Sequence, residues 1–374
     1  MSLAYVGLPC QLEGLRKTEV LSETLKQDWP GKVSLYVGLL CRENWAYTCF
    51  RALIEDDYSL KLDEVSKFDI KKRNIVAFKR DGGKLEFPLE ESRPYVRAGC
   101  QVCLDFTGEL SDISVGAVGS PMKWSTVIVR TEKGMELLKG AEKEGYVEVK
   151  PIEEVKPGTW LVKKLSKEKK EEALKEAEIR GDEGIKVSHI SSLDKSVKEL
   201  IKEAEGKGYD ELEYEVIDGG LCSACGACVA VCPSGCLRIV DERPTLLEGC
   251  KPEECNACYL ACPRVSLPLA ELKSLIFNDG QSYEDGLGEF LGVYAARASD
   301  PKVLERGQDG GAVTALLSYA LDKNIVSGVV SVREGEKPWM PVPAVSKNSE
   351  ELLETSGTFY SYATTIPAVK GDKD

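Results

Sequence analysis

The sequence predicts a mixed α/β fold that is interrupted by a cysteine-dense insert at residues 222–262. Two apolar, β-branched runs at 3–8 and 33–41 are typical of strands, and the amphipathic stretch 43–54 has helical spacing. Similar patterns return after the insert. We therefore expect a core of mixed sheet and helices whose material lies on both sides of the inserted segment.

The part after the insert alternates in the same way as the part before it. Residues 291–296 predict a strand, 310–323 a helix that begins at a glycine pair, and 325–332 a further strand. This order predicts a βαβ-like unit.

Two charged stretches lead from the first part to the insert. Residues 165–180 and 193–205 both have apolar residues at helical spacing within a charged background, which predicts solvated helices before a linker. The expected organisation is a first core part at 1–180, a linker at 181–218, a small domain at 219–270 and a second core part at 271–374.

Length and charge exclude several classes of protein. The 374 residues can bury a sizeable core, and a formal net charge of -13 argues against a nucleic-acid partner, because phosphate binding needs a basic surface. We see no apolar run of bilayer length and no charged-then-apolar leader. We therefore expect a cytoplasmic protein without a transmembrane segment, either free or peripheral to a membrane complex.

The chain has fourteen cysteines and one histidine. A disulfide framework is disfavoured in a chain of this length without an export signal, so the cysteines are expected to be thiolate metal ligands. His189 alone leaves almost no room for mixed Cys/His zinc sites, and its polar surroundings predict a surface position.

The insert begins with a run that has the bacterial ferredoxin spacing. In this pattern a tight loop points three thiolates at one 4Fe-4S cubane, and the fourth cysteine, followed by proline, binds the other cluster. Zinc knuckles are a poorer explanation, because they lack the third cysteine and the Cys-Pro pair. The run consists of Cys222, Cys225, Cys228, Cys232 and Pro233.

A second run follows at once, with its first gap two residues wider, and predicts a second cubane. Cys236 falls outside both runs and is expected to be buried rather than ligating. With the usual crossing of the fourth ligands, one cluster takes Cys222, Cys225, Cys228 and Cys262, and the other takes Cys250, Cys255, Cys258 and Cys232.

Four more cysteines stand outside the insert: Cys10, Cys41, Cys100 and Cys103. Two of them follow predicted strands and two form a close pair, so they could converge on a third cubane at the ends of a sheet. Spacing alone also allows buried free thiols, and Cys49 is spare.

Six short strings agree with one known family. Together they resemble the family of β subunits of coenzyme F420 hydrogenases and dehydrogenases, over about residues 3–180 and 222–367. The strings, among them Gly-Leu-Pro-Cys-Gln and Gly-Gln-Asp-Gly-Gly, lie at 6–17, 40–44, 100–106, 112–114, 119–126 and 307–316.

The resemblance implies an iron-sulfur flavoprotein of anaerobic archaeal, methanogenic metabolism. In the family, FAD exchanges a hydride with the deazaflavin F420 and passes single electrons to 4Fe-4S clusters. It also implies a core cluster at Cys10, Cys41, Cys100 and Cys103. Members with a fused ferredoxin module resemble the input subunit of the F420H2 dehydrogenase and the F420-oxidising half of the F420-dependent sulfite reductase. Redox partner subunits of a hydrogenase, dehydrogenase or reductase complex are therefore implied.

The resemblance also implies a flavin site but no catalytic side chain. Gly310 and Gly311 would let backbone amides approach the FAD pyrophosphate, although the pair could be only a turn before a helix. Trp124 could equally be a core aromatic, and Lys123 stands where relatives often have glycine. The flavin residues implied are Gln308, Asp309, Gly310, Gly311, Thr314, Ser120, Trp124, Ser125 and Thr126.

Three basic residues are candidates for binding the anionic tail of the deazaflavin. Arg130, Lys17 and Arg42 lie in or near the matching strings, but each could be an ordinary surface charge.

The order of the segments departs from the family pattern. Fused relatives run ferredoxin module, Gly-Gln-Asp-Gly-Gly segment, then Gly-Leu-Pro-Cys-Gln segment, whereas here the last segment comes first. The chain therefore resembles a circular permutation joined before Ala4, with a rearranged gene product as the alternative. The tail after Tyr362 is expected to lack the helix that would precede the Ala4 strand.

Three functions remain open at the level of sequence. The first is an enzyme that oxidises F420H2 or reduces F420 and passes electrons to a partner. The second is an electron-transfer subunit without flavin or F420 activity. The third is a ferredoxin-dependent flavin reductase of another substrate.

Overall fold

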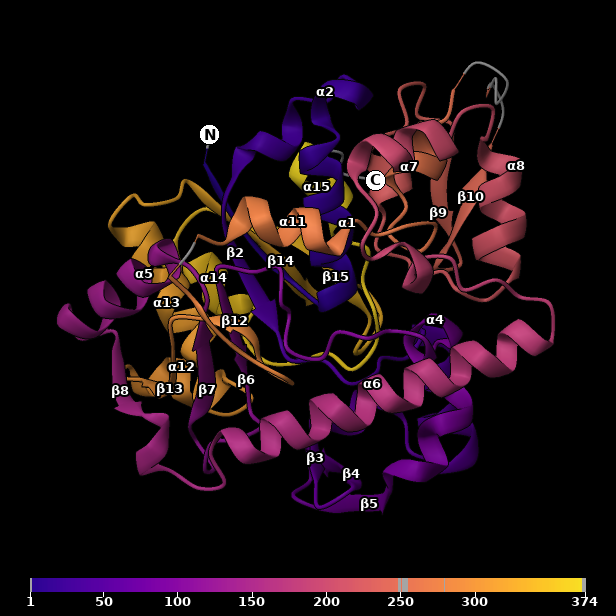
Figure 1. Ribbon diagram of the computed structural model, residues 1–374. Coiled ribbons are helices and arrows are strands. Elements are labelled where there is room, and N and C mark those ends of the chain that lie inside the picture. Colours follow the sequence, from indigo (N-terminus) through magenta and orange to yellow (C-terminus); the bar gives the residue numbers. More distant parts are fainter. Residues whose placement is uncertain (1, 248–249, 251–254, 279, 372–374) are drawn as a thin grey trace.

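The computed structural model describes residues 2–247, 250, 255–278 and 280–371, and its centre is an eight-stranded mixed sheet (Figure 1). The strand order is β15-β14-β1-β2-β6-β7-β13-β8. The strands are β1 Leu3–Gly7, β2 Val33–Leu39, β6 Ile113–Gly116, β7 Ser125–Val129, β8 Val147–Pro151, β13 Gly292–Ala298, β14 Gly328–Glu334 and β15 Pro341–Ser346.

Both flanks of the insert contribute to this one sheet. β1 pairs in parallel with β14 on one side and with β2 on the other, and β13 lies antiparallel between β7 and β8. The expected α/β core of mixed sheet and helices is therefore confirmed. The βαβ-like unit also forms, since β13 and β14 run in the same direction, but four other strands separate them.

One face of the sheet is covered by α5 Glu132–Lys143, α12 Pro301–Arg306, α13 Ala312–Asp322 and α14 Ser349–Glu354. α5 shows why these segments fold as they do. The Thr131 hydroxyl caps the helix by accepting a hydrogen bond from the Gly134 backbone N–H, and Leu137 and Leu138 face the sheet. Burial of such apolar side chains fixes the helices on this face.

The opposite face packs against α1 Pro9–Val20, α11 Leu269–Ile276, α15 Ile366–Lys370 and the cysteine-dense insert. We call the part of the insert around its cysteines the cluster module. It contains the short helices α9 Ala227–Ala230 and α10 Ala257–Ala261 and a hairpin of β9 Leu237–Val240 and β10 Arg243–Leu246. The module is thus part of the same hydrophobic core as the sheet, as Ala227 and Ala261 show.

The helix α6, Thr159–Asp182, runs beneath the sheet toward the cluster module (Figure 1). Much of it is exposed, as expected for a charged helix, but Val162, Lys169 and Ala173 form part of a buried stripe. The second linker helix is α7, Val197–Glu203, which is shorter than expected and buries Leu200.

A separate antiparallel sheet of β3 Val65–Lys71, β4 Asn74–Lys79 and β5 Lys84–Pro88 has its own aromatic core. The predicted helix at 43–54 starts late, as α3 Tyr47–Ala52, and continues as a π-helical turn at Leu53–Asp57. The remaining short elements are α2 Ser22–Leu25, α4 Ala98–Gln101, α8 Tyr209–Leu212, β11 Ser282–Glu284 and β12 Gly288–Phe290.

The tail of the chain corrects one expectation. A helix does follow Tyr362, namely α15, and it packs beside the first strand. The Tyr5 hydroxyl and the Thr365 hydroxyl are 2.7 Å apart, and Lys32 Nζ donates to the Lys370 carbonyl at 3.3 Å. A short helix can therefore be recognised only after its packing partner is known.

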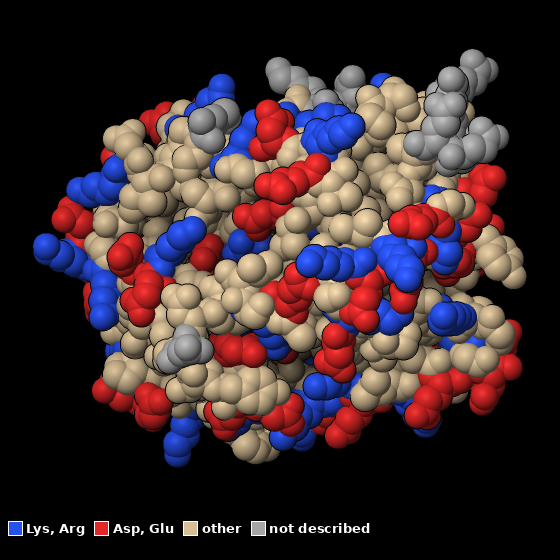
Figure 2. All heavy atoms as spheres, turned by 45° about the horizontal axis from the view of Figure 1, so that its top comes forward, with Lys and Arg blue, Asp and Glu red and all other residues tan. Residues whose placement is uncertain are grey.

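The surface seen in Figure 2 carries interspersed acidic and basic side chains. Within the part of the chain that the structure describes, no helix combines the length and apolar character needed to cross a bilayer.

Candidate functional site

Sheet topology brings together four of the five cysteines outside the module. Cys10 lies in the first turn of α1, directly after β1, and Cys41 follows β2. Because β1 and β2 are adjacent and parallel, these residues leave the sheet at the same edge. Burial raises the pKa of Cys10, and Cys103, Cys100 and Cys41 are close enough for their charges to raise it further. We call these four the core quartet.

The core quartet is a set of buried and half-buried sulfur donors that favours metal binding. Burial raises the pKa of Cys41 to about 12, with the neighbouring thiols adding to the effect. Thiol donors bind metal in the thiolate form. The Lys169 ammonium is buried beside them and donates hydrogen bonds to the Cys41 carbonyl at 2.7 Å and the Asp105 carbonyl at 2.6 Å.

The cluster module gathers Cys222, Cys225, Cys228 and Cys262, which we call the first module quartet. Burial raises the pKa of Cys225 to about 12, and the charges of Cys262 and Cys222 act in the same direction. The Ala224 backbone N–H donates to Cys222 Sγ at 3.3 Å, the kind of bond that stabilises a thiolate.

The second module quartet consists of Cys232, Cys250, Cys255 and Cys258. Burial raises the pKa of Cys258 to about 12, and the other three thiols all influence it. Cys236 is buried, as expected, with its Sγ 3.4 Å from Cys232 Sγ. The two module quartets therefore have the crossed composition that ferredoxin spacing predicts, although ligation itself stays a prediction.

Among the described residues, no three histidine, cysteine or acidic side chains close around one point as they would around a single ion. The thiolates of a cubane bind different iron atoms, so they stand further apart than the ligands of one ion. The all-cysteine composition of the quartets fits iron-sulfur clusters on the chemistry of the donors.

The two segments implied in flavin binding meet at the start of α13. The Gly310 backbone N–H donates to Ser125 Oγ at 3.2 Å, and a Cβ at Gly310 would lie 2.7 Å from the Ala296 carbonyl and the Ser125 nitrogen. Gly311 precedes the helix with φ +63° and supplies no side-chain cap. The first-turn N–H groups of α13 therefore lack a side-chain cap, which fits an anionic group there.

The other implied flavin residues have partners within the protein. The Ser120 and Thr126 hydroxyls are 2.8 Å apart, and the Thr314 hydroxyl is 3.0 Å from that of Ser356. The Gln308 side-chain amide donates to the Phe68 carbonyl at 3.1 Å. These residues lie near the start of α13, and their side chains already form hydrogen bonds within the protein.

Three further positions refine the implied flavin region. Trp124 is buried against Phe106 and Ile128, which favours the core-aromatic alternative. Burial raises the pKa of Asp309, with the Asp69 charge adding to it. Lys123 has φ +65°, a left-handed conformation that favours glycine, which explains why a glycine would suit this position.

Arg130 is not placed to meet an anionic substrate, nor is it a surface charge. Its side chain is fully buried and donates to Ser114 Oγ at 2.9 Å. Its other nitrogens donate to the carbonyls of Leu287 at 2.8 Å, Glu289 at 2.7 Å and Thr107 at 3.2 Å. Arg130 therefore satisfies backbone carbonyls in the core.

Lys17 and Arg42 also differ from their expected roles. Lys17 is 1% exposed and donates to the Cys262 carbonyl at 2.8 Å and to both oxygens of Ser266, at 2.7 and 3.0 Å, so it ties α1 to the cluster module. Arg42 forms a two-pronged ion pair with Glu172 at 2.8 Å from each oxygen.

The prediction that His189 lies at the surface is wrong. It is 2% exposed, with Nε2 3.1 Å from the Val102 carbonyl and 2.9 Å from the Arg264 guanidinium. Burial lowers its pKa well below the usual value, and the Arg264 charge adds to this. A residue in a polar stretch of sequence becomes buried when distant segments pack over it, here those of Val102 and Arg264.

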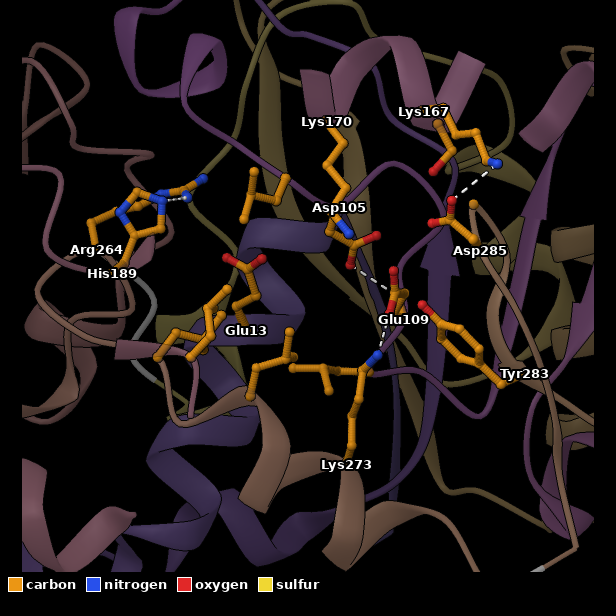
Figure 3. Close-up of a pocket in the computed structure, with 17 residues that line it drawn as sticks. Glu13, Asp105, Glu109, Lys167, Lys170, His189, Arg264, Lys273, Tyr283 and Asp285 are labelled. Carbon is orange, nitrogen blue, oxygen red and sulfur yellow. Dashed lines mark hydrogen bonds and ion pairs between the residues drawn. The ribbon is translucent and has the colours of Figure 1, made fainter. Parts of the chain in front are cut away.

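His189 and Arg264 border a cavity of about 110 Å³ between α1, α6 and the cluster module (Figure 3). Glu13 lies between this pair and Asp105 in the close-up. Three buried polar atoms here lack a hydrogen-bond partner among the described residues: Glu13 Oε2, His189 Nδ1 and Arg264 Nε. Burial raises the pKa of Glu13 to about 7, although Arg264 opposes this.

Two parts of one family match the chain in reversed order. Residues 1–155 match the C-terminal part of "Coenzyme F420 hydrogenase/dehydrogenase, beta subunit", and residues 293–370 match the N-terminal part of the same protein. The chain belongs to the family of coenzyme F420 hydrogenase/dehydrogenase beta subunits. Residues 215–238 of this beta-type chain match a 4Fe-4S binding domain, so it also carries a 4Fe-4S binding segment.

Curated relatives agree with this membership. The chain is 41% identical over 183 residues to coenzyme F420 hydrogenase subunit beta of Methanosarcina barkeri, covering 49% of this chain and 62% of the relative. It is 36% identical over 164 residues to the coenzyme F420-dependent sulfite reductase of Methanocaldococcus jannaschii, covering 41% and 26%. The chain spans less than two thirds of the length of these relatives.

One further curated relative and one solved structure are also similar to this chain. The F subunit of the F(420)H(2) dehydrogenase of Methanosarcina mazei is 30% identical over 164 residues, covering 44% of each chain. A chain of the F420-reducing [NiFe] hydrogenase complex from M. barkeri is 40% identical, with a TM-score of 0.46, and covers 48% of this chain and 61% of that one. This member of the family is thus homologous to F420 hydrogenase beta subunits and F420-dependent oxidoreductases.

Sequence reasoning did not select Lys169, Arg264 or Glu13 in this family member. Each belongs to a charged or ligand-dense stretch, where its burial has no local signal. The position of Arg264, directly after the Cys262-Pro263 pair, could have suggested a place near a metal site.

Proposed function

We propose that this chain exchanges a hydride between coenzyme F420 and a bound FAD and passes electrons singly through 4Fe-4S clusters to a partner subunit. The observation that carries the proposal is the gathering of twelve cysteines into three quartets beside the family's shared core. The divided core at 1–180 and 271–374, with linker 181–218 and cluster domain 219–270, is part of this proposal, as is a cytoplasmic location without nucleic-acid partners.

The residues that would hold the clusters are the members of the three quartets. When bound, FAD would convert two-electron transfer into one-electron transfer, and the clusters would carry single electrons. The chain supplies buried thiol donors, and Lys169 and Arg264 offset the negative charge of the core quartet. Neither Lys169 nor Arg264 needs to transfer a proton in this role.

The flavin would bind where the α13 N-terminus meets β7. The uncapped first turn after Gly311 offers backbone donors to an anionic group, and Ser125 positions the preceding glycine. Close packing of Gly310 on the sheet keeps this turn in place. Ser120, Thr126 and Thr314 would shape the same region through their internal hydrogen bonds.

The proposal is tested by purifying the full chain without oxygen and measuring iron, flavin and the absorbance spectrum before and after adding F420H2. We expect about twelve irons and one flavin per chain, with both chromophores bleached by F420H2. A Cys41→Ser variant is expected to retain about eight irons. Eight irons in the parent, no flavin, or a flavin that F420H2 does not reduce would contradict the proposal.

A further inference from the structure

Arg264 belongs to the cluster module but faces the cysteines of the core. It follows the Cys262-Pro263 pair, is 2% exposed and contacts His189 at 2.9 Å. The His189 ring that it contacts lies 3.1 Å from the carbonyl of Val102, the residue before Cys103, so Arg264 reaches the core quartet. An arginine side chain keeps its positive charge in proteins, so Arg264 places a fixed charge at the boundary between the two parts.

The same charge also acts on the first module quartet. Arg264 follows Cys262 by two residues, and its charge acts on both Cys262 and Cys222. Arg264 is thus a buried cation shared by two of the three quartets.

Lys169 is a second buried cation, and it serves the core quartet. It is 5% exposed and is held in place by hydrogen bonds to the carbonyls of Cys41 and Asp105. Short hydrogen bonds to two carbonyl oxygens suit a positively charged ammonium group. Since Lys169 comes from α6, the core quartet receives positive charge from two independent elements.

The module quartets have neighbours of their own. Other thiols of the module act on Cys250 and Cys258 in the second module quartet. The first module quartet has a further buried basic neighbour in Lys17, which donates to the Cys262 carbonyl at 2.8 Å.

A buried cation beside a cluster has a direct redox consequence. A cluster gains one negative charge when it accepts an electron, and a nearby buried cation stabilises that charge more strongly than it stabilises the oxidised cluster. Charges outside the ligand set are known to tune the properties of metal centres. Two fixed cations beside the core quartet must therefore favour its reduced form.

We propose that Lys169 and Arg264 raise the reduction potential of the core cluster, and that Arg264 makes this potential depend on the docked cluster module. The inference rests on the proposed function, because it needs a cluster in the core quartet. Each reduction adds one electron, and neither side chain makes or breaks a bond. Lys169 and Arg264 are positioning residues, because they act through charge on the cluster and its thiolates.

The test is an anaerobic redox titration of the full, cluster-loaded chain, followed by electron paramagnetic resonance. We expect K169Q to raise the oxidised-to-reduced ratio of the core signal at least tenfold at a fixed solution potential, which is about 59 mV for one electron. R264Q should shift both the core signal and one module signal. The core signal is identified as the one absent from C41S.

Lys170 provides the matched control, because it is the next residue of α6, is exposed and carries the same charge. K170Q is expected to leave the oxidised-to-reduced ratio of the core signal within twofold of the parent ratio, because solvent screens the charge of an exposed side chain. An equal shift in K170Q, or an unchanged core signal in both K169Q and R264Q, would overturn the inference alone.

A parent protein without a core signal would overturn the proposed function and this inference together. Where a glutamine variant loses iron, the charge-retaining variants K169R and R264K decide the matter. We expect them to hold the parent's iron and the parent's potential. If K169R or R264K holds the parent's iron but still shifts the oxidised-to-reduced ratio tenfold, side-chain charge is not the cause and the inference is overturned.

Discussion

Arg130 shows how charged side chains can stabilise this fold without contacting solvent. Its guanidinium joins the Ser114 hydroxyl to carbonyls of Thr107, Leu287 and Glu289, which come from segments more than 150 residues apart in sequence. Arg130 supplies hydrogen-bond donors to all three carbonyls, of which that of Leu287 also accepts from the Thr107 hydroxyl at 3.3 Å.

We predict that R130Q lowers the free energy of unfolding by about 3 kcal/mol or more, because its removal leaves several buried carbonyls unsatisfied. The thermal midpoint of the oxygen-free protein measures this. R42Q is the control, since it breaks a partly exposed ion pair with Glu172 and a long hydrogen bond to the Leu165 carbonyl, and it should cost at most about 1 kcal/mol. Equal losses in the two variants would contradict the role assigned to Arg130.

At the residue scale, cysteine positions could be predicted from sequence but the roles of charged residues could not. Cysteine spacing is local chemistry, so Cys222 and its neighbours gather as the ferredoxin pattern predicts. Arg130, Lys17 and His189 each contact residues on distant segments of the chain, which for His189 is Arg264. Those contacts exist only after the sheet and module have packed together.

At the element scale, α6 depends on how it begins. Gly158 precedes the helix with φ +69° and ψ -161°, a combination that is essentially restricted to glycine, and its N–H donates to the Gly119 carbonyl at 2.8 Å. This turn sets the direction of the helix that presents Lys169 to the core quartet.

We predict that G158A destabilises the protein by about 1–3 kcal/mol because of backbone strain, whereas G181A near the other end of α6 stabilises it by up to about 1 kcal/mol. A Cβ at Gly181 would meet no atom within 4 Å, and this glycine has helical backbone geometry. Chemical or thermal unfolding of both variants checks the signs. A stabilised G158A would show that the turn is not strained by a side chain.

Strand prediction succeeded where apolar runs were buried on both faces, as in β1 and β2. Helix limits were less predictable. The segment 43–54 begins as a helix only at Tyr47, and α15 is too short to have a clear periodic pattern. Both depend on tertiary packing, which overrides local preference.

At the scale of the whole molecule, the reversed order of the two family segments is compatible with one continuous sheet. β1 pairs with β14 through Leu3 and Gly328, and with β2 on its other side. Lys32, directly before β2, donates from its side chain to the Lys370 carbonyl at the end of α15. The end of α15 and the start of β1 therefore lie close enough for a short connection.

We predict that a reordered chain, 185–371 joined by a short Gly/Ser linker to 2–184, folds with the same iron content as the parent. The new ends fall after Gly184, which is exposed and where an added Cβ would meet no atom within 4 Å. Iron analysis and circular dichroism check this. A control opened inside β2 should not fold, and loss of the core cluster from the reordered chain would contradict the shared sheet.

The pairing of β1 with β14 also affects the timing of synthesis. Ser2 and Ser327, which hydrogen-bond beside these strands, are separated by 325 residues. At about 5–20 residues per second, the ribosome needs roughly 16–65 s to deliver the second partner after the first. During that interval one edge of β1 has no native neighbour, so the nascent chain should be a client for chaperones that shield strand edges.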